Sequence, residues 1–441
     1  MIGLPAGPRR AGAGRRALCG PGQEISAGTI GSGGLTLARV VVTGGAGFVG
    51  AAVAHALRGR GDEVVALDVV RGPGVRQADV SRSGDWEKAL AGADLVVHAA
   101  AAGLGGVGEL PAIRAGNPLG NGKVPAERMR QALLGGTATV LDAAARAGVG
   151  RLLHLSCLSV LGPRLADGVD ETAPIGLTGD PRADTMAAAE QAVRAASVSG
   201  LPTTILRVGD AYGPRAGRWT IWPVLLLRAG RFVLLDGGAG WLNPVHIDDV
   251  VAATVAAAAS ERAAGATLHV TGPAASTVAD FVGHYCTMLE LPRPRSVPTK
   301  MYHALDDATG VVERLRVRVE SRRGAVGRPA GAGGPAASSP ATAPGSAAHP
   351  DATGPTASAA ARELVRGVGA RIGARVDPRT RMDLGPISVA DVSRTGGLSG
   401  DLITTLTGWR PRVELADGMS GTEEWLRDTG LLGVREPARR G

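Results

Sequence analysis

Cysteine and aromatic side chains are scarce in this sequence. Its 441 residues include three Cys, six Trp, three Tyr and three Phe. Cys19, Cys157 and Cys286 lie too far apart for a disulfide framework or a zinc site, so no metal is expected and a reducing cytoplasm is the predicted compartment. The Arg residues are scattered and few aromatic rings are available for base stacking, so we expect no nucleic-acid partner.

Long apolar runs are also missing. No stretch approaches the ~18 uninterrupted apolar residues of a membrane span. Residues 1–38 carry several Arg, but they lack the apolar run of a signal peptide and show neither helical nor strand periodicity. We therefore expect a soluble chain without a membrane partner, in which residues 1–38 form a disordered leader.

The sequence does contain a regular alternation of short β-branched runs with Ala-rich stretches. The expected strands are Val40–Thr43, Glu63–Asp68, Asp94–His98, Arg151–Ser156, Thr203–Val208 and Thr267–Thr271. Strands that alternate with helices run parallel and are joined by right-handed crossovers, which place helices on both faces of one sheet. The pattern predicts an α/β fold, a Rossmann-type doubly wound parallel sheet with a smaller C-terminal substrate lobe.

Composition suggests where these parts begin and end. A Rossmann domain is expected over residues 39–272, with substrate-lobe segments from about 210–245, and residues 273–320 start the C-terminal lobe. Within 321–360, 31 of 40 residues are Ala, Gly, Pro or Ser, which bury too little apolar area to offset chain entropy. This stretch is predicted to be a disordered insert. Residues 361–441 continue the lobe, and their last helix is expected to pack back on the preceding region.

A glycine-rich turn follows the first expected strand. Gly44, Gly47 and Gly50 precede and open a helix from Phe48 to Leu57 whose apolar residues recur at helical spacing. The first glycine permits a tight turn, the second lets the backbone approach a pyrophosphate, and the third lets the helix pack on the strand. The helix N-terminus at Phe48 and Val49 offers N–H groups to the phosphates. The turn therefore predicts a dinucleotide site.

Asp68 closes the next expected strand, 18 residues after Gly50. A carboxylate at this position accepts hydrogen bonds from both ribose hydroxyls and repels a 2′-phosphate, which favours NAD over NADP as the cofactor. Arg71, three residues further on, would face such a phosphate if Asp68 turned away.

These residues resemble the extended short-chain dehydrogenase/reductase family, which includes sugar-nucleotide epimerases and dehydratases and 3β-hydroxysteroid dehydrogenases. The likeness runs from Val40 to Thr271 and returns at Gly408–Leu432, which is similar to the family's "GWxPxxxLxxGxxxTxxWL" segment. Leu206–Pro214 is similar to "LRPGNVYGP", and Pro244–Val250 to "FVHVDDV". By this resemblance Asp79 and Val80 contact the adenine, and Ala100 and Ala101 lie beside the cofactor.

The family's catalytic signature is replaced. Relatives carry a Ser or Thr before a Tyr-x-x-x-Lys pair, in which the Lys ammonium lowers the pKa of the proton-carrying Tyr phenol. In the corresponding positions this sequence has Cys157, Arg182 and Met186, and Leu133 stands where an Asn is expected. No Tyr precedes a Lys by four residues anywhere in the chain. An Arg guanidinium, with a pKa above about 12, cannot do the work of the phenol.

Several side chains remain as candidates for the chemistry, each beside a structural alternative. Cys157 is either a weak donor or nucleophile, or inert packing. Arg182 either binds an anionic group such as a carboxylate or phosphate, or is solvated near a helix start. Asp210 is either a base facing substrate or the acceptor of a structural hydrogen bond. His246 is the histidine to test, and Asp184 or Thr185 is expected to cap the helix that runs to Ser199.

Two functions stay open at this stage. The first is an enzyme of the epimerase/dehydratase type, acting on a sugar nucleotide, a steroid-like molecule or a secondary metabolite by non-standard or non-redox chemistry. The second is a non-catalytic sensor or scaffold that binds NAD(H). The partner is a small molecule in the first case, and the resemblance also implies a homodimer.

Overall fold

Seven parallel strands form the central sheet in the computed structural model, which describes residues 38–100, 126–303 and 384–432. The strand order is β11-β6-β5-β4-β1-β2-β3. The strands are β1 (Arg39–Thr43), β2 (Glu63–Asp68), β3 (Val75–Gln77), β4 (Leu95–His98), β5 (Arg151–Cys157), β6 (Thr203–Val208) and β11 (Thr267–Val270). The order reverses direction at β1, so the carboxyl ends of β1 and β4 flank the crevice in which ligands of such sheets bind.

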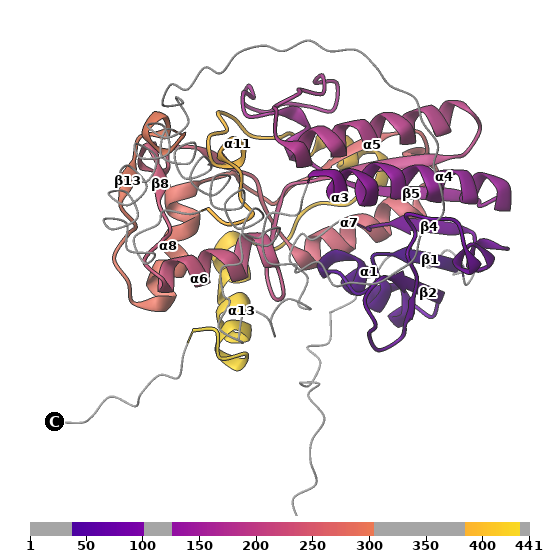
Figure 1. The fold of residues 1–441 in the computed structure, drawn as a ribbon, viewed down its shortest axis with the longest axis horizontal. Coiled ribbons are helices and arrows are strands. Elements are labelled where there is room, and N and C mark those ends of the chain that lie inside the picture. The colour runs from indigo at the N-terminus through magenta and orange to yellow at the C-terminus, as the bar shows by residue number, and fades with distance from the viewer. Residues whose placement is uncertain (1–37, 101–125, 304–383, 433–441) are drawn as a thin grey trace, which may run out of the picture. The chain divides into compact units, whose positions relative to one another are not determined.

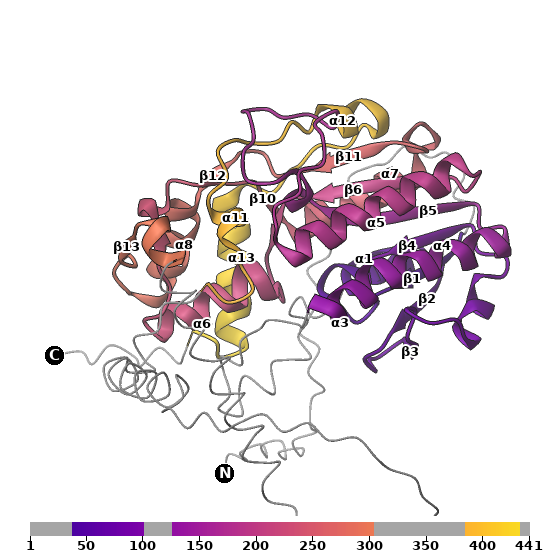
Figure 2. The same ribbon diagram turned by 45° about the horizontal axis from the view of Figure 1, so that its top comes forward.

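The alternating side chains of each strand pack on two different layers. Along β1, Val40 and Val42 are buried in one apolar cluster and Val41 in another, as the two-residue period of a strand requires. The first cluster lies under α1 (Phe48–Gly59), α7 (Ile247–Ala259) and α12 (Asp401–Thr407). The second lies under α4 (Gly136–Ala147) and α5 (Pro181–Val198), and α3 (Ala126–Arg130) contacts α5. The predicted α/β, doubly wound sheet is confirmed (Figures 1 and 2).

A third apolar cluster lies outside the large sheet. It unites α6 (Trp222–Arg228), α8 (Val278–Leu289), α11 (Val389–Val392) and α13 (Leu415–Asp428). Three short strand pairs connect these helices to the rest: β7 (Asp210–Tyr212) with β10 (Pro244–His246), β9 (Trp241–Leu242) with β12 (Ser276–Thr277), and β8 (Leu234–Leu235) with β13 (Ser296–Val297). In Figure 1 this lobe, with α13 in yellow, stands beside the carboxyl ends of the sheet strands.

A buried ion pair fixes α5 against the sheet. Arg207 of β6 donates to both carboxylate oxygens of Glu190, at 2.9–3.2 Å, and Ser156 of β5 donates to the same carboxylate at 2.5 Å. The Glu190 and Arg207 side chains are 0% and 1% exposed. These contacts set the rotation of α5, and with it the direction of residues 186 and 182, one and two turns earlier.

Two local expectations need correction. Helix α5 is capped by Asp180, whose carboxylate accepts from the N–H groups of Arg182 and Ala183 at 2.9 Å, and not by Asp184 or Thr185. Asp184 instead accepts from Thr178 and Gly179. Pro181 explains the difference, since its fixed φ suits the first helical position and moves the cap to the residue before it. The short edge strand β3 also went unpredicted, because three residues are too few to show a period.

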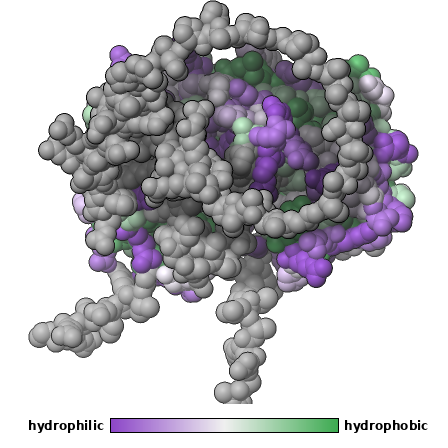
Figure 3. All heavy atoms as spheres, viewed as in Figure 1, coloured by the Kyte–Doolittle hydropathy of each residue, from purple (hydrophilic) through white to green (hydrophobic). Residues whose placement is uncertain are grey.

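Charged side chains of both signs cover the edge of the sheet at β2 and β3. Exposed residues there include Arg58, Arg76, Arg82, Asp85 and Lys88. Figure 3 shows hydrophilic side chains along this side of the molecule. No helix within the described residues is long and apolar enough to cross a membrane. The predicted leader 1–38, except Ala38, and the predicted insert 321–360 lie outside the described residues.

Candidate cofactor and substrate site

The glycine turn after β1 leaves no room for side chains. Gly44 has a φ of +71°, and a Cβ there would meet the Ala99 carbonyl oxygen at 2.6 Å. A Cβ on Gly50 would lie 2.2 Å from the Gly44 carbonyl oxygen. The sequence therefore folds into a turn that presents bare backbone, as the dinucleotide interpretation requires.

The N-terminus of α1 opens from this turn with unused donors. Its N-cap is Gly47, which provides no side-chain hydrogen bond. No described residue accepts a hydrogen bond from the backbone N–H of Phe48 or Val49. Free amides at the positive end of a helix dipole are a ready site for a diphosphate. The residues present fit the phosphates of a dinucleotide.

Asp68 turns toward the glycine turn. One carboxylate oxygen accepts from the Ala46 N–H at 3.0 Å, the other from the Val70 N–H at 2.9 Å, and the residue lines the cavity at this end. Each oxygen keeps a lone pair for a ribose hydroxyl. Arg71 points elsewhere, because its Nε donates to the Gln77 amide oxygen at 2.7 Å and the residue is exposed.

The structure describes three of the four residues that the resemblance places at the adenine or beside the cofactor. Asp79 is exposed at the end of the β3 edge, and its carboxylate accepts from the N–H and hydroxyl of Ser81, which lower its pKa against a smaller opposing effect of burial. Val80 is buried, and Ala100 is half-buried just after β4. Ala101 lies outside the described residues.

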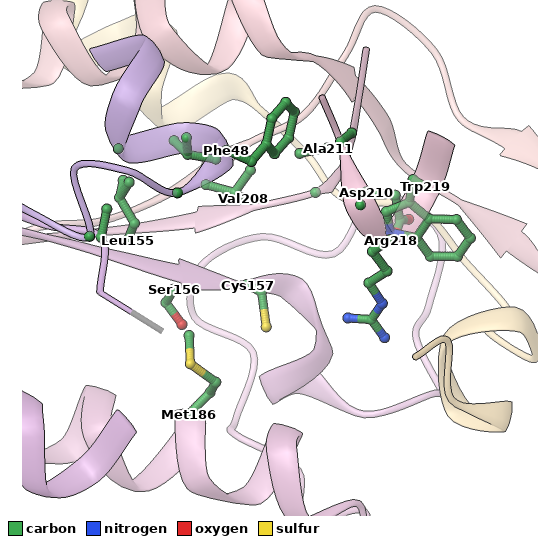
Figure 4. A pocket seen from close by; sticks show the side chains of 18 of the residues that line it. Phe48, Leu155, Ser156, Cys157, Met186, Val208, Asp210, Ala211, Arg218 and Trp219 are labelled. Carbon is green, nitrogen blue, oxygen red and sulfur yellow. The ribbon is translucent and has the colours of Figure 1, made fainter. Parts of the chain in front are cut away.

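A cavity of about 230 Å³ runs from the glycine turn to the second lobe. Its glycine end is formed by Gly44, Gly47, Phe48, Val49, Gly50 and Asp68, and its far end by Cys157, Ser159, Arg182, Met186, Asp210, Arg218 and Trp219. Apolar wall between the ends comes from Leu155 and Val208. Figure 4 shows Phe48 and Val208 on one side and the sulfur atoms of Cys157 and Met186 facing each other on another.

The three positions of the missing proton relay meet in this cavity. Cys157, Arg182 and Met186 all line it. Met186 is buried and shares an apolar cluster with Leu133 and Cys157. Ser156, the neighbour of Cys157, is buried with its hydroxyl committed to Glu190. The place where relatives hold their Tyr and Lys therefore carries a guanidinium and a thioether.

Arg182 is half-buried and weakly bonded. Its Nη2 lies 3.6 Å from the Cys157 sulfur and its Nη1 3.5 Å from the Ser159 hydroxyl, both long contacts, and its buried Nε has no partner. It forms no salt bridge with any described carboxylate. Although burial opposes its charge, Cys157 and the carboxylates of Asp391, Asp180 and Asp210 raise the pKa of Arg182.

Arg218 enters the cavity from the π-helical turn Gly217–Ile221 after β7. Its guanidinium lies over the Trp219 ring, 5.7 Å from the centroid, and donates to Asp391. Figure 4 shows this guanidinium extending into the same space as the Cys157 sulfur. Burial and the nearby charge of Arg182 lower the pKa of Arg218, while Asp391 opposes this effect. Both guanidiniums remain charged, since Arg does not deprotonate in proteins.

The α11 segment, which precedes α12, supports this end of the cavity. Asp391 accepts from the Ser159 hydroxyl at 2.8 Å and from Arg394 at 3.3 Å, besides Arg218. Its side chain is 2% exposed. Against the cost of burial, the guanidiniums of Arg218, Arg394 and Arg182 hold the pKa of the Asp391 carboxyl well below its usual range.

Asp210 is held by the same segment. Arg394 donates to both Asp210 oxygens, at 2.6 and 2.8 Å, and the Asn243 N–H donates at 2.8 Å. Burial disfavours the charge of Arg394, but the Asp210 and Asp391 carboxylates raise its pKa. A carboxylate occupied in this way is poorly placed to take a proton from substrate, so the geometry favours the structural alternative for Asp210.

His246 does not line the cavity. Its Nδ1 accepts from the Asp248 N–H at 3.3 Å and caps α7, and its ring packs edge-on against Tyr212. Among the described residues no group of three His, Cys, Asp or Glu side chains could hold a metal ion.

Sequence reasoning missed Arg218, Trp219 and the α11 residues. Arg218 follows the "YGP"-like stretch closely, so its nearness to the cavity was inferable from the resemblance. Asp391 and Arg394 carry no local signal, because they lie 173 and 184 residues after their partners Arg218 and Asp210.

Fold and site together define a dinucleotide-binding protein of the Rossmann class. A sequence model of the NAD dependent epimerase/dehydratase family matches residues 40–270. The chain belongs to this family, and the predicted resemblance to extended short-chain dehydrogenases/reductases is confirmed.

The relatives include reductases of small molecules. A 3-diazoavenalumate denitrifying reductase from Streptomyces sp is 33% identical, over 60% of this chain and 85% of the relative. A 2-alkyl-3-oxoalkanoate reductase from Stenotrophomonas maltophilia (strain K279a) is 32% identical, over 49% of this chain and 63% of the relative, so the chain spans less than two thirds of that protein. Together with the family match they support an NAD-dependent enzyme of the extended short-chain type.

Solved structures agree on the fold. DesIV, a dTDP-glucose 4,6-dehydratase from Streptomyces venezuelae with NAD and TYD bound, has a TM-score of 0.57 at 22% identity, covering 89% of this chain and 98% of that chain. MoeE5 in complex with UDP-glucose and NAD has a TM-score of 0.56 at 19% identity, covering 88% and 99%. At such identities the likeness speaks for the fold alone.

Proposed function

We propose that this protein is an NADH-dependent reductase that places a hydride on a small molecule at a centre that needs no proton from the enzyme. The observation that carries the proposal is the cavity itself. One end has the glycine turn and the Asp68 carboxylate that suit a dinucleotide, and the other holds Arg182 and Met186 where a proton relay would stand. Neither side chain is a proton donor at neutral pH.

NAD rather than NADP is the proposed cofactor. Asp68 faces the glycine turn, where it would accept the ribose hydroxyls and repel a 2′-phosphate. Arg71, the residue that the sequence offers for binding that phosphate, is turned to Gln77 at the surface. Phe48 and Val49 would hold the diphosphate with their free amides.

An aryl diazonium group is the electrophile that best suits such a site. The denitrifying reductase among the relatives is named for the removal of nitrogen from a diazo compound. The bound cofactor would supply a hydride. When a hydride adds to a carbon that carries a diazonium group, the C–H bond forms, the C–N bond breaks and its electron pair leaves with N₂. No proton enters the reaction, so a site without a Tyr and Lys suffices.

The chain's own residues then serve to hold and shield the substrate. Leu155, Met186, Val208 and Trp219 give the cavity an apolar wall that excludes water from the reacting carbon. In this proposal Cys157 contacts the substrate without transferring a proton, and Asp210 holds Arg394. Arg182 transfers no proton and remains available to bind an anionic group of the substrate.

The test is a reaction of the full chain with 4-carboxybenzenediazonium and NADH that carries deuterium at the transferred position. We expect enzyme-dependent loss of NADH, one N₂ for each NADH oxidised, and benzoate with deuterium at the carbon that lost nitrogen. Parallel samples without enzyme measure the spontaneous reduction. A 3-oxo acid serves as the carbonyl control and should not be reduced.

Two results would contradict the proposal. Efficient carbonyl reduction or alcohol oxidation that survives Cys157→Ala and Asp210→Ala would show that the altered site performs ordinary chemistry by another route. Binding of NADH, seen as a higher melting temperature, without acceleration of the diazonium reaction would favour the non-catalytic sensor.

A further inference from the structure

One guanidinium in the cavity wall forms no direct salt bridge with the residues that the structure describes. Arg182 has no salt bridge to a described residue, its two contacts are 3.5 and 3.6 Å long, and its Nε is buried without a partner. A partly buried charge without a partner is costly to keep. The cost is offset when an anion binds, because a guanidinium forms two parallel hydrogen bonds to a carboxylate.

A second guanidinium reaches the same end of the cavity. Arg218 has one carboxylate partner, Asp391, and a buried Nε without a partner. Among the described residues, the other ionised side chain at this end of the wall is Asp210, whose charge is matched by Arg394. Asp180 lies outside the wall and accepts from backbone N–H groups of α5. The wall therefore carries an excess of positive charge that α11 fixes in place.

We propose that Arg182 and Arg218 form a clamp for the carboxylate of the substrate, and that the substrate is a flat aromatic or conjugated acid. Trp219 beside Arg218 and the apolar residues Leu155, Met186 and Val208 form the rest of the wall. A planar apolar body with a single negative end matches that combination. This inference rests on the proposed function for the chemistry of the substrate. The claim that Arg182 and Arg218 bind a carboxylate does not depend on that chemistry.

A nucleoside diphosphate fits the clamp less well. One unpaired and one half-paired guanidinium suit the single charge of a carboxylate better than the multiple charges of a diphosphate.

The test compares trans-cinnamate with its methyl ester, which removes only the charge. Binding to the full chain saturated with NAD is measured by calorimetry and by quenching of tryptophan fluorescence. We expect the acid to bind at least about tenfold more tightly than the ester. Arg182→Gln should remove that difference by weakening the acid alone, and Arg182→Lys should retain part of it.

Matched controls separate the clamp from general damage. Arg164→Gln changes an exposed Arg of the same lobe boundary and should leave both affinities unchanged. Arg218→Gln gives a second variant should Arg182→Gln fold poorly. NADH affinity, measured in every variant, should stay within error of the unaltered chain, since neither Arg lies at the glycine end.

The result that overturns the clamp is equal affinity for acid and ester, absence of binding by the acid, or an acid affinity that neither Gln variant changes. Stronger competition by inorganic phosphate than by benzoate would overturn the choice of a carboxylate. Failure of the reductase proposal looks different, since cinnamate would then bind in an Arg182-dependent way while the diazonium reaction stays unaccelerated.

Discussion

At the scale of single residues, two side chains decide what the site can bind and do. Asp68 stands at the cofactor end and Cys157 at the substrate end of one cavity. Asp68 accepts from the Ala46 N–H, which orients its carboxylate toward the glycine turn, where we propose that the ribose binds. Cys157 replaces a hydroxyl of the family's relay and contacts the unpaired Arg182.

Asp68→Asn should weaken NADH binding. The neutral amide loses a charge-assisted hydrogen bond to the ribose, worth about 1.5–3 kcal/mol, so the Kd should rise about tenfold or more. NADPH should gain relative to NADH because the repulsion of its 2′-phosphate is removed. Fluorescence titration with both coenzymes measures the ratio. The control is Asp85→Asn, which changes an exposed carboxylate paired with Lys88. An unchanged ratio of NADH to NADPH affinity in Asp68→Asn would refute the role of Asp68.

Cys157→Ala should leave hydride transfer nearly intact. General acid catalysis contributes about 100-fold or more to a rate, so a drop in kcat below tenfold shows that the thiol carries no essential proton. Single-turnover NADH oxidation with the diazonium probe provides the rate. A loss of 100-fold or more, with retained NADH binding, would instead make Cys157 a participant in the chemistry.

At the scale of elements, α1 and α11 supply the two ends of the cavity. Helix α1 brings its free N-terminus to the cofactor end, and its close approach to β1 depends on glycine. Helix α11 has only four residues, yet its Asp391 organises Arg218, Arg394 and Ser159.

Two Gly→Ala changes in α1 should differ sharply. Gly50→Ala puts a Cβ 2.2 Å from the Gly44 carbonyl oxygen, so the turn must open and NADH binding should be lost. Gly59→Ala has nothing within 4 Å of the new Cβ and should keep full NADH affinity and equal or greater stability. NADH titration and urea unfolding test both, and comparable NADH binding in the two variants would contradict the cradle.

Asp391→Asn should loosen the substrate end and lower stability. Removing one partner from a buried ionic cluster leaves guanidiniums uncompensated, at a cost of about 3 kcal/mol or more. The free energy of unfolding in urea measures the loss. Asp167→Asn, at an exposed position, should be neutral within about 0.5 kcal/mol. A stable Asp391→Asn variant that binds cinnamate like the unaltered chain would show that α11 has no part in positioning Arg218.

At the scale of the whole molecule, buried neutral histidines make the fold sensitive to acid. Burial lowers the pKa of His98 to about 3, with His154 adding to the effect, and burial lowers the pKa of His154 and of His269 to about 4 each. The rings of His98 and His154 stack with centroids 5.4 Å apart, and both nitrogens of His154 are buried without a partner.

The free energy of unfolding should fall as the pH drops below 6.5. Unfolded histidines take up protons near 6.5 while the folded ones stay neutral until about 3 to 4, so this contribution is complete above pH 6.5 and is lost through the acid range. Near pH 5 the unfolded state binds up to three more protons than the folded state. The free energy of unfolding should therefore change by up to about 4 kcal/mol per pH unit. His154→Phe should reduce the slope by one proton, whereas exposed His55→Gln should not. Urea unfolding between pH 7.5 and 5 checks both; equal slopes would contradict the assignment.

The sequence by itself determined most of the sheet and the glycine turn. Strand and helix periods appear within the longer elements, though not in the three-residue β3, and Gly44 and Gly50 are required by backbone sterics within one turn, so local pattern sufficed there. It also showed the loss of the Tyr and Lys, because that pair has a fixed spacing on one helix.

Only the tertiary structure decided the substrate end. Asp210 looked like a candidate base until Arg394, 184 residues later, proved to bind both of its oxygens. Arg182 looked solvated or anion-binding with equal reason, and only its contacts in the fold, with Cys157 and Ser159, show that it forms no salt bridge with a described carboxylate. Charged side chains can pair although they lie far apart in the sequence, so no local sequence pattern predicts which ones pair. The physical reason is that backbone conformation depends mainly on residues adjacent in the sequence, whereas the electrostatic environment of a buried charge depends on residues that the fold brings near it.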